Sequence, residues 1–319
     1  MIVSRCPVRV SLAGGSTDLE SYLQEYKYGT VIGFTADVYC YINMKTDRLG
    51  LNGLDDKYVI DYMNREVVTN VGDIKNDIAR TVLSHYKIPA TTLWFTSDIY
   101  ASGSGLASST AYLIAMINAI ENHLGIESSK SEVCRLAHSL EKNFNPLTGY
   151  QDPYACGTGG LNRFHFHDNG EVQIEKLKSD ILENLNMYLV STGATRSSTE
   201  ILGTLDLKKC SELVKITESL HTSIENNDTQ RFFELINEGW NLKKRTGKIT
   251  EDARVSSIDN VLSCDNEVLA HRLLGAGNGG YFLIFTKNNL PVKRIQDKLG
   301  TRVTRIKTCN DGPTVMKMR

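Results

Sequence analysis

Alternating apolar and polar positions, which are typical of β-strands, recur along much of the chain. In the first such stretch Val8, Val10 and Leu12 share one face, and Arg9 lies on the opposite face. This alternation, or a short apolar run as at 281–286, predicts strands at residues 3–12, 30–46, 57–62, 91–98, 161–166, 172–177, 187–192, 281–286 and 301–308. Glycine turns follow several of these strands, so side chains near their ends are candidates for a functional site.

Helical periodicity fills most of the remaining chain. It predicts an amphipathic helix at residues 74–86, a helix apolar almost all round from Thr110 to Leu124, and a helix starting at Ser129 with capping-box spacing to Glu132. A long helical region is expected from 199 to about 273, and a short helix at 291–299. Strands and helices interleaved in this way indicate an α+β fold, with a domain boundary between about 177 and 195.

Length, charge and cysteine content narrow the class of protein. The 319 residues allow two domains, and the net charge of -1 argues against a nucleic-acid or anionic membrane partner. We expect a cytoplasmic protein, because the sequence has no signal-peptide pattern and no apolar run near the roughly 18 residues of a membrane span. Seven scattered cysteines without a C-x-x-C pair are expected to be free thiols.

A glycine- and serine-rich stretch between the strand at 91–98 and the apolar helix predicts a phosphate cradle. Its residues are Gly103, Ser104, Gly105, Leu106, Ala107, Ser108, Ser109 and Thr110. Glycines permit a tight turn, and the helix start offers unpaired N–H groups and the positive end of its dipole to an anion. No lysine follows Gly105, so this is not a P-loop. A simple strand-to-helix turn with serine caps is the alternative.

Two more glycine-containing stretches accompany this cradle. Residues 6–18 read C-P-V-R-V-S-L-A-G-G-S-T-D, and residues 275–280 read G-A-G-N-G-G before an apolar strand. Together, in this order, the three stretches resemble the three motifs of the GHMP kinase superfamily of galactokinase, homoserine kinase, mevalonate kinase and phosphomevalonate kinase. Within it the sequence is most similar to the bacterial D-glycero-D-manno-heptose 7-phosphate kinases, which open with P-x-R-x-S-x-A-G-G-x-T-D.

The resemblance implies a two-domain α+β GHMP kinase fold with its active site in the interdomain cleft. Residues 1–185 would form the N-terminal domain with the ATP cradle and the catalytic residues, and residues 186–319 a ferredoxin-like C-terminal domain. It also implies ATP and Mg²⁺ as cofactors, with Ser109 and Glu141 matching the magnesium ligands. From the residues alone, a surface position is favoured for Glu141 over a half-buried ligand. Ala107 stands where many relatives have glycine, which strains the loop only if its φ is positive.

Asp152 is the predicted catalytic residue, because residues 148–157 resemble the family's G-x-x-D-Q segment. It would deprotonate or orient the acceptor hydroxyl. Arg9 matches the arginine that lies beside this aspartate and would keep it ionised. Pro153 replaces the usual glutamine. A helix N-cap or turn aspartate before proline is the alternative for Asp152.

The substrate is expected to lie against the first glycine turn, which contains Gly15, Ser16, Thr17 and Asp18. Asp18 would accept sugar hydroxyls, or it could instead cap a helix at residues 19–25. Arg196, surrounded by hydroxyl residues, suits a phosphate on the acceptor, although Ser197 and Ser198 could simply cap the next helix. Gly277 and Gly279, in the third motif, would close the triphosphate region. His165 and His167 are interpreted as surface residues rather than metal ligands.

The resemblance therefore predicts an ATP-dependent kinase that phosphorylates the anomeric hydroxyl of D-glycero-D-manno-heptose 7-phosphate to the 1,7-bisphosphate, toward nucleotide-activated heptose for surface polysaccharide. Its partners would be the sugar phosphate and ATP, and the sequence leaves open whether the protein forms a homodimer. Alternatives are a kinase for another free sugar, such as fucose, arabinose or a uronic acid, and a catalytically silent sugar sensor. A decarboxylase of the same superfamily is disfavoured by the Gly-Gly-Ser-Thr-Asp turn.

Overall fold

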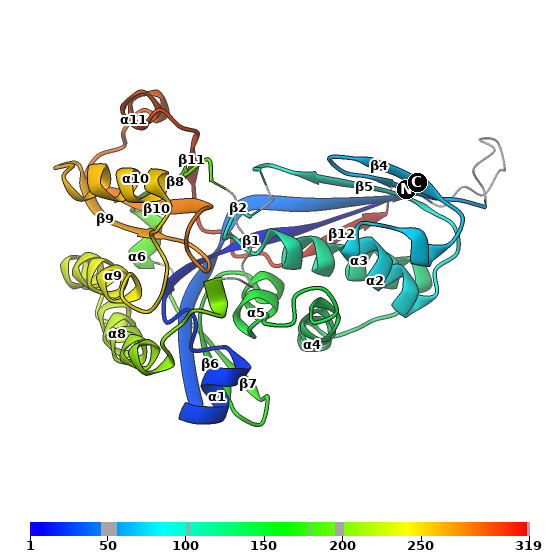
Figure 1. Cartoon of the computed structure of the whole chain (residues 1–319), viewed down its shortest axis with the longest axis horizontal. Helices are drawn as coiled ribbons and strands as arrows, with labels where there is room; N and C mark the ends of the chain where they lie inside the picture. Colours follow the sequence, from blue (N-terminus) through cyan, green and yellow to red (C-terminus); the bar gives the residue numbers. More distant parts are fainter. Residues whose placement is uncertain (46–55, 101–102, 179, 195–200, 318–319) are drawn as a thin grey trace.

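Two β-sheets with helices packed beside them make up the protein. The computed structural model describes residues 1–45, 56–100, 103–178, 180–194 and 201–317. In the larger sheet the strands run in the order β12-β1-β2-β5-β3-β4, and β6 joins β2 and carries β7 at its side. The second sheet has the order β11-β8-β10-β9. The described pairs are antiparallel except for β3 with β5. Figure 1 shows the two parts side by side, with β1 and β2 running between them.

The larger sheet and the helices before the second sheet come from the first part of the chain, apart from β12. The strands are β1 (Ile2–Ala13), β2 (Tyr28–Lys45), β3 (Tyr58–Asp61), β4 (Arg65–Val68), β5 (Thr92–Ser97), β6 (Leu161–His167), β7 (Val172–Lys176) and β12 (Thr314–Lys317). The helices are α1 (Glu20–Tyr26), the 3₁₀ turn η1 (Val71–Asp73), α2 (Asp77–Tyr86), α3 (Ser108–Leu124), α4 (Lys130–Glu141), α5 (Gln151–Thr158) and α6 (Asp180–Glu183).

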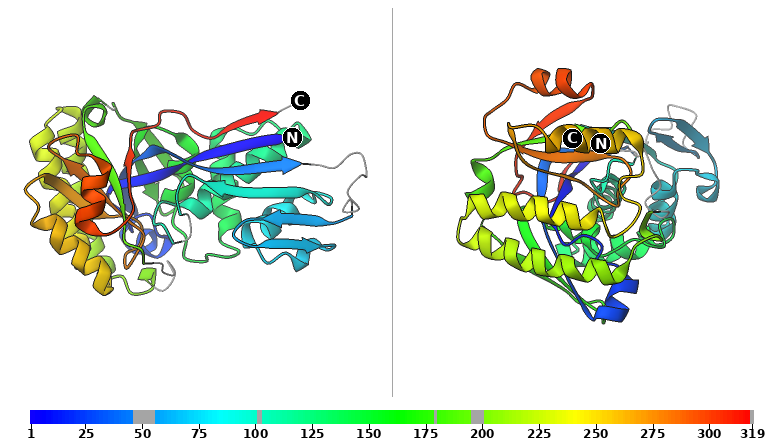
Figure 2. Two further views of the ribbon diagram at one scale, coloured as in Figure 1. Left: turned by 90° about the horizontal axis from the view of Figure 1, so that it is seen from above. Right: turned by 60° about the vertical axis from the view of Figure 1, so that its left-hand side comes forward.

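The second sheet and its helices follow. The strands are β8 (Asn186–Ser191), β9 (Val268–Leu273), β10 (Tyr281–Thr286) and β11 (Val303–Ile306). The helices are α8 (Leu207–Glu225), α9 (Thr229–Lys243), α10 (Ala253–Ser263) and α11 (Val292–Leu299). Figure 2 shows α8 and α9 as an antiparallel pair and the two chain ends close together, consistent with the pairing of β1 with β12. The last strand thus returns to the first sheet, across the expected boundary at residue 185.

The α+β fold class and the two-part organisation agree with the sequence, and the apolar helix is buried as its pattern predicts. Helix α3 packs on β1 and β2, and Leu113, Ile117 and Ile120 are completely buried. It begins at Ser108, two residues before the predicted start. In α4 the Ser129 hydroxyl accepts from the Glu132 amide, and the Glu132 side chain accepts from the Ser129 amide, which is the predicted capping box. The sequence patterns of α3 and α4 therefore predict these helices correctly, because the packing of the folded chain favours the same helices.

Other predicted elements were wrong or missing. Residues 268–273 form β9 rather than the end of a helix, since the strand hydrogen-bonds to β10 and buries its last four side chains. Helix α5, which was not predicted, begins at Gln151 and contains Pro153 in its first turn, where proline loses no helical hydrogen bond. The short strands β4 and β12 were also missed. Each has only four residues, too few for a clear alternation.

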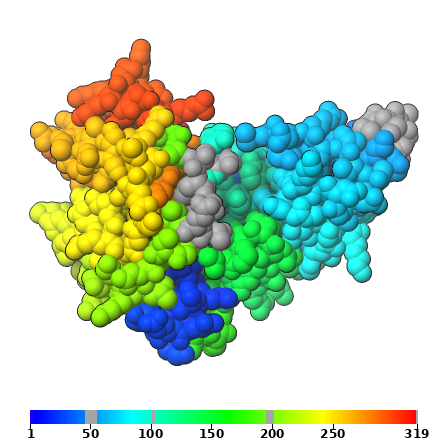
Figure 3. All heavy atoms as spheres, in the orientation of Figure 1, coloured from blue at the N-terminus to red at the C-terminus, as the bar shows by residue number. Residues whose placement is uncertain are grey.

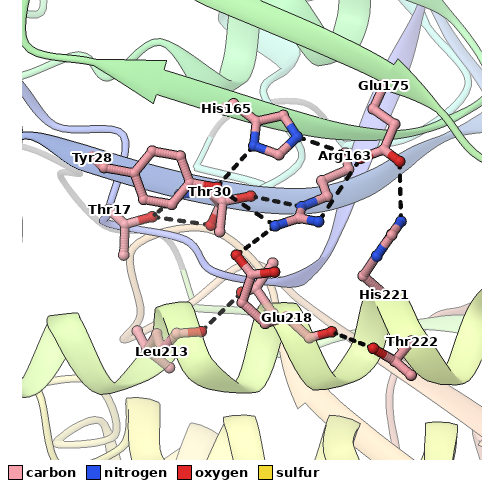
Figure 4. A network of polar contacts seen from close by, with 11 residues as sticks. Thr17, Tyr28, Thr30, Arg163, His165, Glu175, Leu213, Glu218, His221 and Thr222 are labelled. Carbon is pink, nitrogen blue, oxygen red and sulfur yellow. Dashed lines mark hydrogen bonds and ion pairs between the residues drawn. The ribbon is translucent and has the colours of Figure 1, made fainter.

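A buried arginine links the two parts of the molecule (Figure 4). Arg163 on β6, whose side chain is 8% exposed, donates to Glu218 on α8, and Glu175 on β7 lies 3.8 Å from it. Glu175 also contacts His165 at 3.3 Å and His221 at 3.1 Å. His165 is therefore half-buried in an ion-pair network, which corrects the expectation of a surface residue. Burial lowers the pKa of His165 below its usual value. The network positions α8 against the first sheet.

All seven cysteines are free thiols, as predicted, and all except Cys264 are buried. In the described parts of the chain, no helix has the length and apolar character that a membrane crossing requires. No group of three histidine, cysteine or acidic side chains among the described residues could hold a metal ion by itself.

Candidate active site

A cleft of about 250 Å³ lies where the two parts of the chain meet. Figure 3 shows these parts as two sides of the molecule, with α8 to α10 in yellow to orange and α2 to α5 in cyan to green. From the first part it is lined by Arg9, Ser11, Gly15, Ser16, Asp18, Leu19, Gly103, Ser104, Gly105, Ala107, Ser108, Ser109, Thr110, Glu141, Asn145, Thr148, Gly149, Gln151 and Asp152. From the second it is lined by Leu202, Lys243, Gly275 and Ala276. All three sequence motifs therefore contribute to one cleft.

The cradle wraps the amino-terminal end of α3. Ala107, the residue just before α3, has φ +60°, in the left-handed region that disfavours alanine by about 1–2 kcal/mol. The departure from glycine at this position therefore strains the loop. The Ser104 and Ser108 hydroxyls lie 2.7 Å apart, and Ser104 also accepts from the Leu106 amide. Ser108, Ser109 and Thr110, in the first turn of α3, line the cleft. The N–H groups of a first helical turn have no partner within the helix, which suits an anionic phosphate.

The third glycine motif packs against the cradle, as the sequence indicates. A β-carbon on Gly105 would collide with the Leu274 carbonyl, and one on Gly280 would collide with the Ser104 carbonyl. Both glycines also have positive φ. The close approach of the two loops therefore requires glycine at both positions. Of the third motif, only Gly275 and Ala276 line the cleft.

Arg9 and Asp152 form an ion pair at the base of the cleft. The Nε and Nη2 atoms of Arg9 each lie 2.8 Å from Oδ1 of Asp152. Arg9 is almost completely buried and also donates to the Gly105 carbonyl, whereas the Asp152 side chain is 29% exposed. Asp152 lies in the first turn of α5 but is not its N-cap, which is Tyr150. Both contacts from Arg9 thus go to one oxygen of Asp152, and Asp152 lines the same cleft as the loop from Gly103 to Thr110.

Glu141, the last residue of α4, is buried and faces the cleft. Thr110 donates a 2.8 Å hydrogen bond to its Oε2. Burial, followed by the negative charge of Asp152, raises the pKa of Glu141 to about 7. A buried carboxyl beside a second carboxylate and two hydroxyl side chains, Ser109 and Thr110, is an oxygen-rich donor set. Such a set fits a magnesium ion that keeps most of its other ligands from nucleotide and water. The surface alternative for Glu141 was therefore wrong.

Asp18 is buried in the wall of the cleft. Its Oδ1 accepts from the Ser16 amide at 3.2 Å, and its Oδ2 accepts from the Gln151 amide at 3.0 Å. Burial raises the pKa of Asp18 above its usual value. It does not cap α1, whose N-cap residue, Leu19, makes no side-chain capping bond. Asp18 instead ties the first glycine turn to the start of α5, while its carboxyl group remains on the cleft wall.

Several residues predicted for the site lie elsewhere. Thr17 is fully buried and its hydroxyl donates to the Gly14 carbonyl. Leu106 is buried in the core, and neither it nor Gly277 or Gly279 lines the cleft. Arg196, with Ser197 and Ser198, lies outside the described residues.

Five polar residues of the cleft escaped the sequence analysis: Ser11, Asn145, Thr148, Gln151 and Lys243. Ser11 is two positions after Arg9 on β1, so the alternation of the strand could have placed it on the same face. Gln151 precedes Asp152 at the start of the unpredicted helix α5. Lys243 is the last residue of α9, 234 residues after Arg9 in sequence, and only the packing of the two parts brings it to the cleft.

Known proteins resemble this chain in both sequence and structure. Residues 74–160 match the family of GHMP kinases N terminal domain. A D-glycero-alpha-D-manno-heptose 7-phosphate kinase from Campylobacter jejuni is 26% identical, and the alignment covers 94% of each chain. An L-fucokinase/L-fucose-1-P guanylyltransferase from Bacteroides fragilis is 22% identical over 93% of this chain and 36% of its own length. The crystal structure of a D-glycero-D-manno-heptose 1-phosphate kinase from Bacteroides thetaiotaomicron superposes with a TM-score of 0.79 at 19% identity, covering 100% of both chains.

A glycine-lined loop beside an Arg–Asp pair, on a fold that matches the two heptose phosphate kinases almost from end to end, is that of a phosphotransferase. The chain is similar to the GHMP kinases along its whole length, and residues 74–160 match their N-terminal domain, as its three motifs indicate.

Proposed function

We propose that this protein is an ATP- and magnesium-dependent sugar kinase whose acceptor is D-glycero-D-manno-heptose 7-phosphate. The product would be the 1,7-bisphosphate, a precursor of nucleotide-activated heptose for surface polysaccharide. The observation that carries this proposal is the full-length similarity to the heptose 7-phosphate kinase of Campylobacter jejuni. The cleft supports it because an acceptor between Asp18 and Asp152 would have its hydroxyl beside the cradle that holds the nucleotide phosphates.

The described residues supply what phosphoryl transfer needs. The cradle from Gly103 to Thr110 would bind the phosphates of ATP through backbone N–H groups and hydroxyls. Ser109 and Glu141 would hold magnesium, which neutralises charge on the phosphate oxygens. Asp152 would orient or deprotonate the acceptor hydroxyl, and the buried Arg9 would keep Asp152 ionised. An anomeric hydroxyl is more acidic than an ordinary alcohol, so its deprotonation is comparatively easy.

A kinase for a free sugar is the second candidate, favoured by the similarity to the fucokinase over 93% of this chain. A panel of sugars with ATP, followed by ADP release, separates the two candidates. We expect kcat/KM to be highest for the phosphorylated heptose. A higher value for fucose, arabinose or a uronic acid would replace the heptose proposal, and no turnover of any sugar would favour a sugar-binding sensor.

Arg196, predicted to bind the acceptor phosphate, can be tested with the same assay. Arg196→Ala should lower kcat/KM for heptose 7-phosphate by an amount equivalent to about 2–4 kcal/mol, because it removes one partner of a desolvated charge pair. Activity on unphosphorylated heptose should scarcely change. A loss that is equal for both sugars would indicate a general defect and would remove Arg196 from the acceptor site.

The magnesium assignment predicts a shifted metal dependence. Glu141→Gln removes a charged oxygen ligand and should raise the magnesium concentration for half-maximal activity by roughly 10-fold; Ser109→Ala should shift it in the same direction. The measurement is initial rate against free magnesium at saturating ATP. Glu238→Gln, which alters an exposed carboxylate paired with Arg231, serves as the control. Magnesium curves for both site variants that overlay the wild-type curve would show that the ion is held elsewhere.

A further inference from the structure

Three polar side chains without an assigned role surround the open face of Gly15 in the cleft. A β-carbon built on Gly15 would lie 3.7 Å from Oε1 of Gln151, 3.8 Å from Oγ of Ser11 and 3.9 Å from Nζ of Lys243. The φ of Gly15 is not in the left-handed region, so its backbone conformation does not require glycine. What glycine provides here is space at the centre of three polar groups.

Two of the three groups are buried without a hydrogen-bond partner in the described part of the protein. They are Oγ of Ser11 and Nε2 of Gln151, in residues that are 4% and 5% exposed. Buried polar atoms are nearly always paired, and an unpaired one costs about 1–3 kcal/mol. Both atoms belong to residues that line the cleft. They are therefore positioned to bind a ligand that fills the space over Gly15.

Lys243 brings a positive charge to the same space from the other part of the molecule. It is 4% exposed, and its ammonium group donates to the Gly275 carbonyl. An ammonium group has three donors and no acceptor, and a serine hydroxyl and a carboxamide NH₂ can donate as well. A cationic donor and two neutral donors around one space are complementary to an oxyanion.

The position of these groups relative to the catalytic pair indicates which oxyanion they bind. Ser11 follows Arg9 by two residues on the same face of β1, and Gln151 directly precedes Asp152. None of the three belongs to the cradle at residues 103–110. The space over Gly15 therefore adjoins the catalytic pair. On the side of Lys243 it also adjoins Gly275, which packs against Gly105 of the cradle.

We propose that Ser11, Gln151 and Lys243 form a phosphate subsite over Gly15 that binds the phosphate already present on the acceptor sugar. This inference rests on the proposed function in taking a sugar phosphate as the acceptor. In this proposal Ser11, Gln151 and Lys243 distinguish a phosphorylated sugar from a free sugar, and they do so without Arg196. The same chemistry would also suit the γ-phosphate of ATP, so the experiment must separate acceptor from nucleotide.

The kinetic test compares Lys243→Met, Lys243→Arg and Gly15→Ala with wild type. Lys243→Met should lower kcat/KM for heptose 7-phosphate by about 30-fold or more, since it removes a buried charge partner, and Lys243→Arg should restore part of the loss. Gly15→Ala should act in the same direction by filling the space without straining the backbone. For the two Lys243 variants, KM for ATP and kcat/KM for free heptose should stay within about 3-fold of the wild-type values. Lys248→Met, which removes an exposed lysine nearby, is the matched control.

A binding test does not depend on the identity of the sugar. With a non-hydrolysable ATP analogue and magnesium saturating the cradle, inorganic phosphate is titrated into each protein by calorimetry. Wild type and Lys248→Met should bind it, and Lys243→Met and Gly15→Ala should bind it about 10-fold or more weakly.

The outcomes separate the subsite from the proposed function. Equal losses on both heptoses, or a rise in KM for ATP alone, would overturn the subsite. If the wild-type protein phosphorylates neither heptose, the heptose proposal fails, and the phosphate titration alone tests the subsite. Phosphate binding that is weakened by Lys243→Met would support the subsite. Phosphate binding that is absent, or that does not depend on Lys243, would overturn it.

Discussion

Asp152→Asn should lower kcat by about 100-fold or more while leaving ATP affinity nearly unchanged. Both contacts from Arg9, through Nε and Nη2, go to Oδ1 of Asp152 at 2.8 Å. An asparagine can keep this oxygen in place, so the pair retains its geometry. What it loses is the second carboxylate oxygen, which is replaced by an NH₂ group that cannot accept the proton of the acceptor hydroxyl. The measurements are kcat from ADP release and the dissociation constant of ATP.

Asp168→Asn is the control for this substitution, because Asp168 is an exposed aspartate whose partner, Lys27 at 3.1 Å, is exposed as well. It should have wild-type kinetics. If Asp152→Asn also turned over at the wild-type rate, Asp152 would neither accept nor orient the hydroxyl, and its role would be limited to pairing with Arg9. A loss confined to ATP affinity would point instead to a disturbed cradle, since Arg9 also binds the Gly105 carbonyl.

Acidification should destabilise the protein through His138, by about 3 kcal/mol between pH 7 and pH 4. His138 on α4 is buried against Tyr150, with ring centroids 4.2 Å apart. Burial, and then the positive charge of Lys142, lowers its pKa to about 4. Below about pH 6.5 the unfolded chain therefore binds a proton that the native protein rejects until about pH 4. The stability that depends on a neutral His138 is thus present above pH 6.5 and is lost as the pH falls.

His138→Phe isolates this contribution because it keeps a ring against Tyr150 and removes the titrating group. The free energy of unfolding of wild type minus that of the variant, from urea titrations, should fall by about 3 kcal/mol from pH 7 to pH 4. The difference is needed because Glu141, with a pKa raised to about 7, contributes with opposite sign: its protonation favours the native state as the pH falls. His85→Phe, at an exposed position on α2, should leave the profile parallel to wild type. A parallel profile for His138→Phe would contradict the expectation.

Sequence patterns predicted an element of this fold correctly where the residues that determine it lie close together in the chain. Helix α3 follows from an apolar run, and the capping box of α4 from two residues three positions apart. Strand β9 was missed because its six residues come after a long helical region and gain strand geometry only by pairing with β10. The sequence could not decide between the two roles considered for Asp18 for the same reason. The amide that donates to its Oδ2 belongs to Gln151, 133 positions away in the chain.

By itself, the sequence determined the glycine-rich loop, the buried helix behind it, the α+β class and the resemblance to the GHMP kinases, because these depend on short-range spacing and backbone preference. The tertiary structure alone decided that Glu141 is buried beside Asp152 and that Ser11, Gln151 and Lys243 surround Gly15. It also decided that Thr17 supports the turn from behind the cleft. These arrangements depend on burial and on contacts between distant segments, and neither is encoded in the spacing of neighbouring residues.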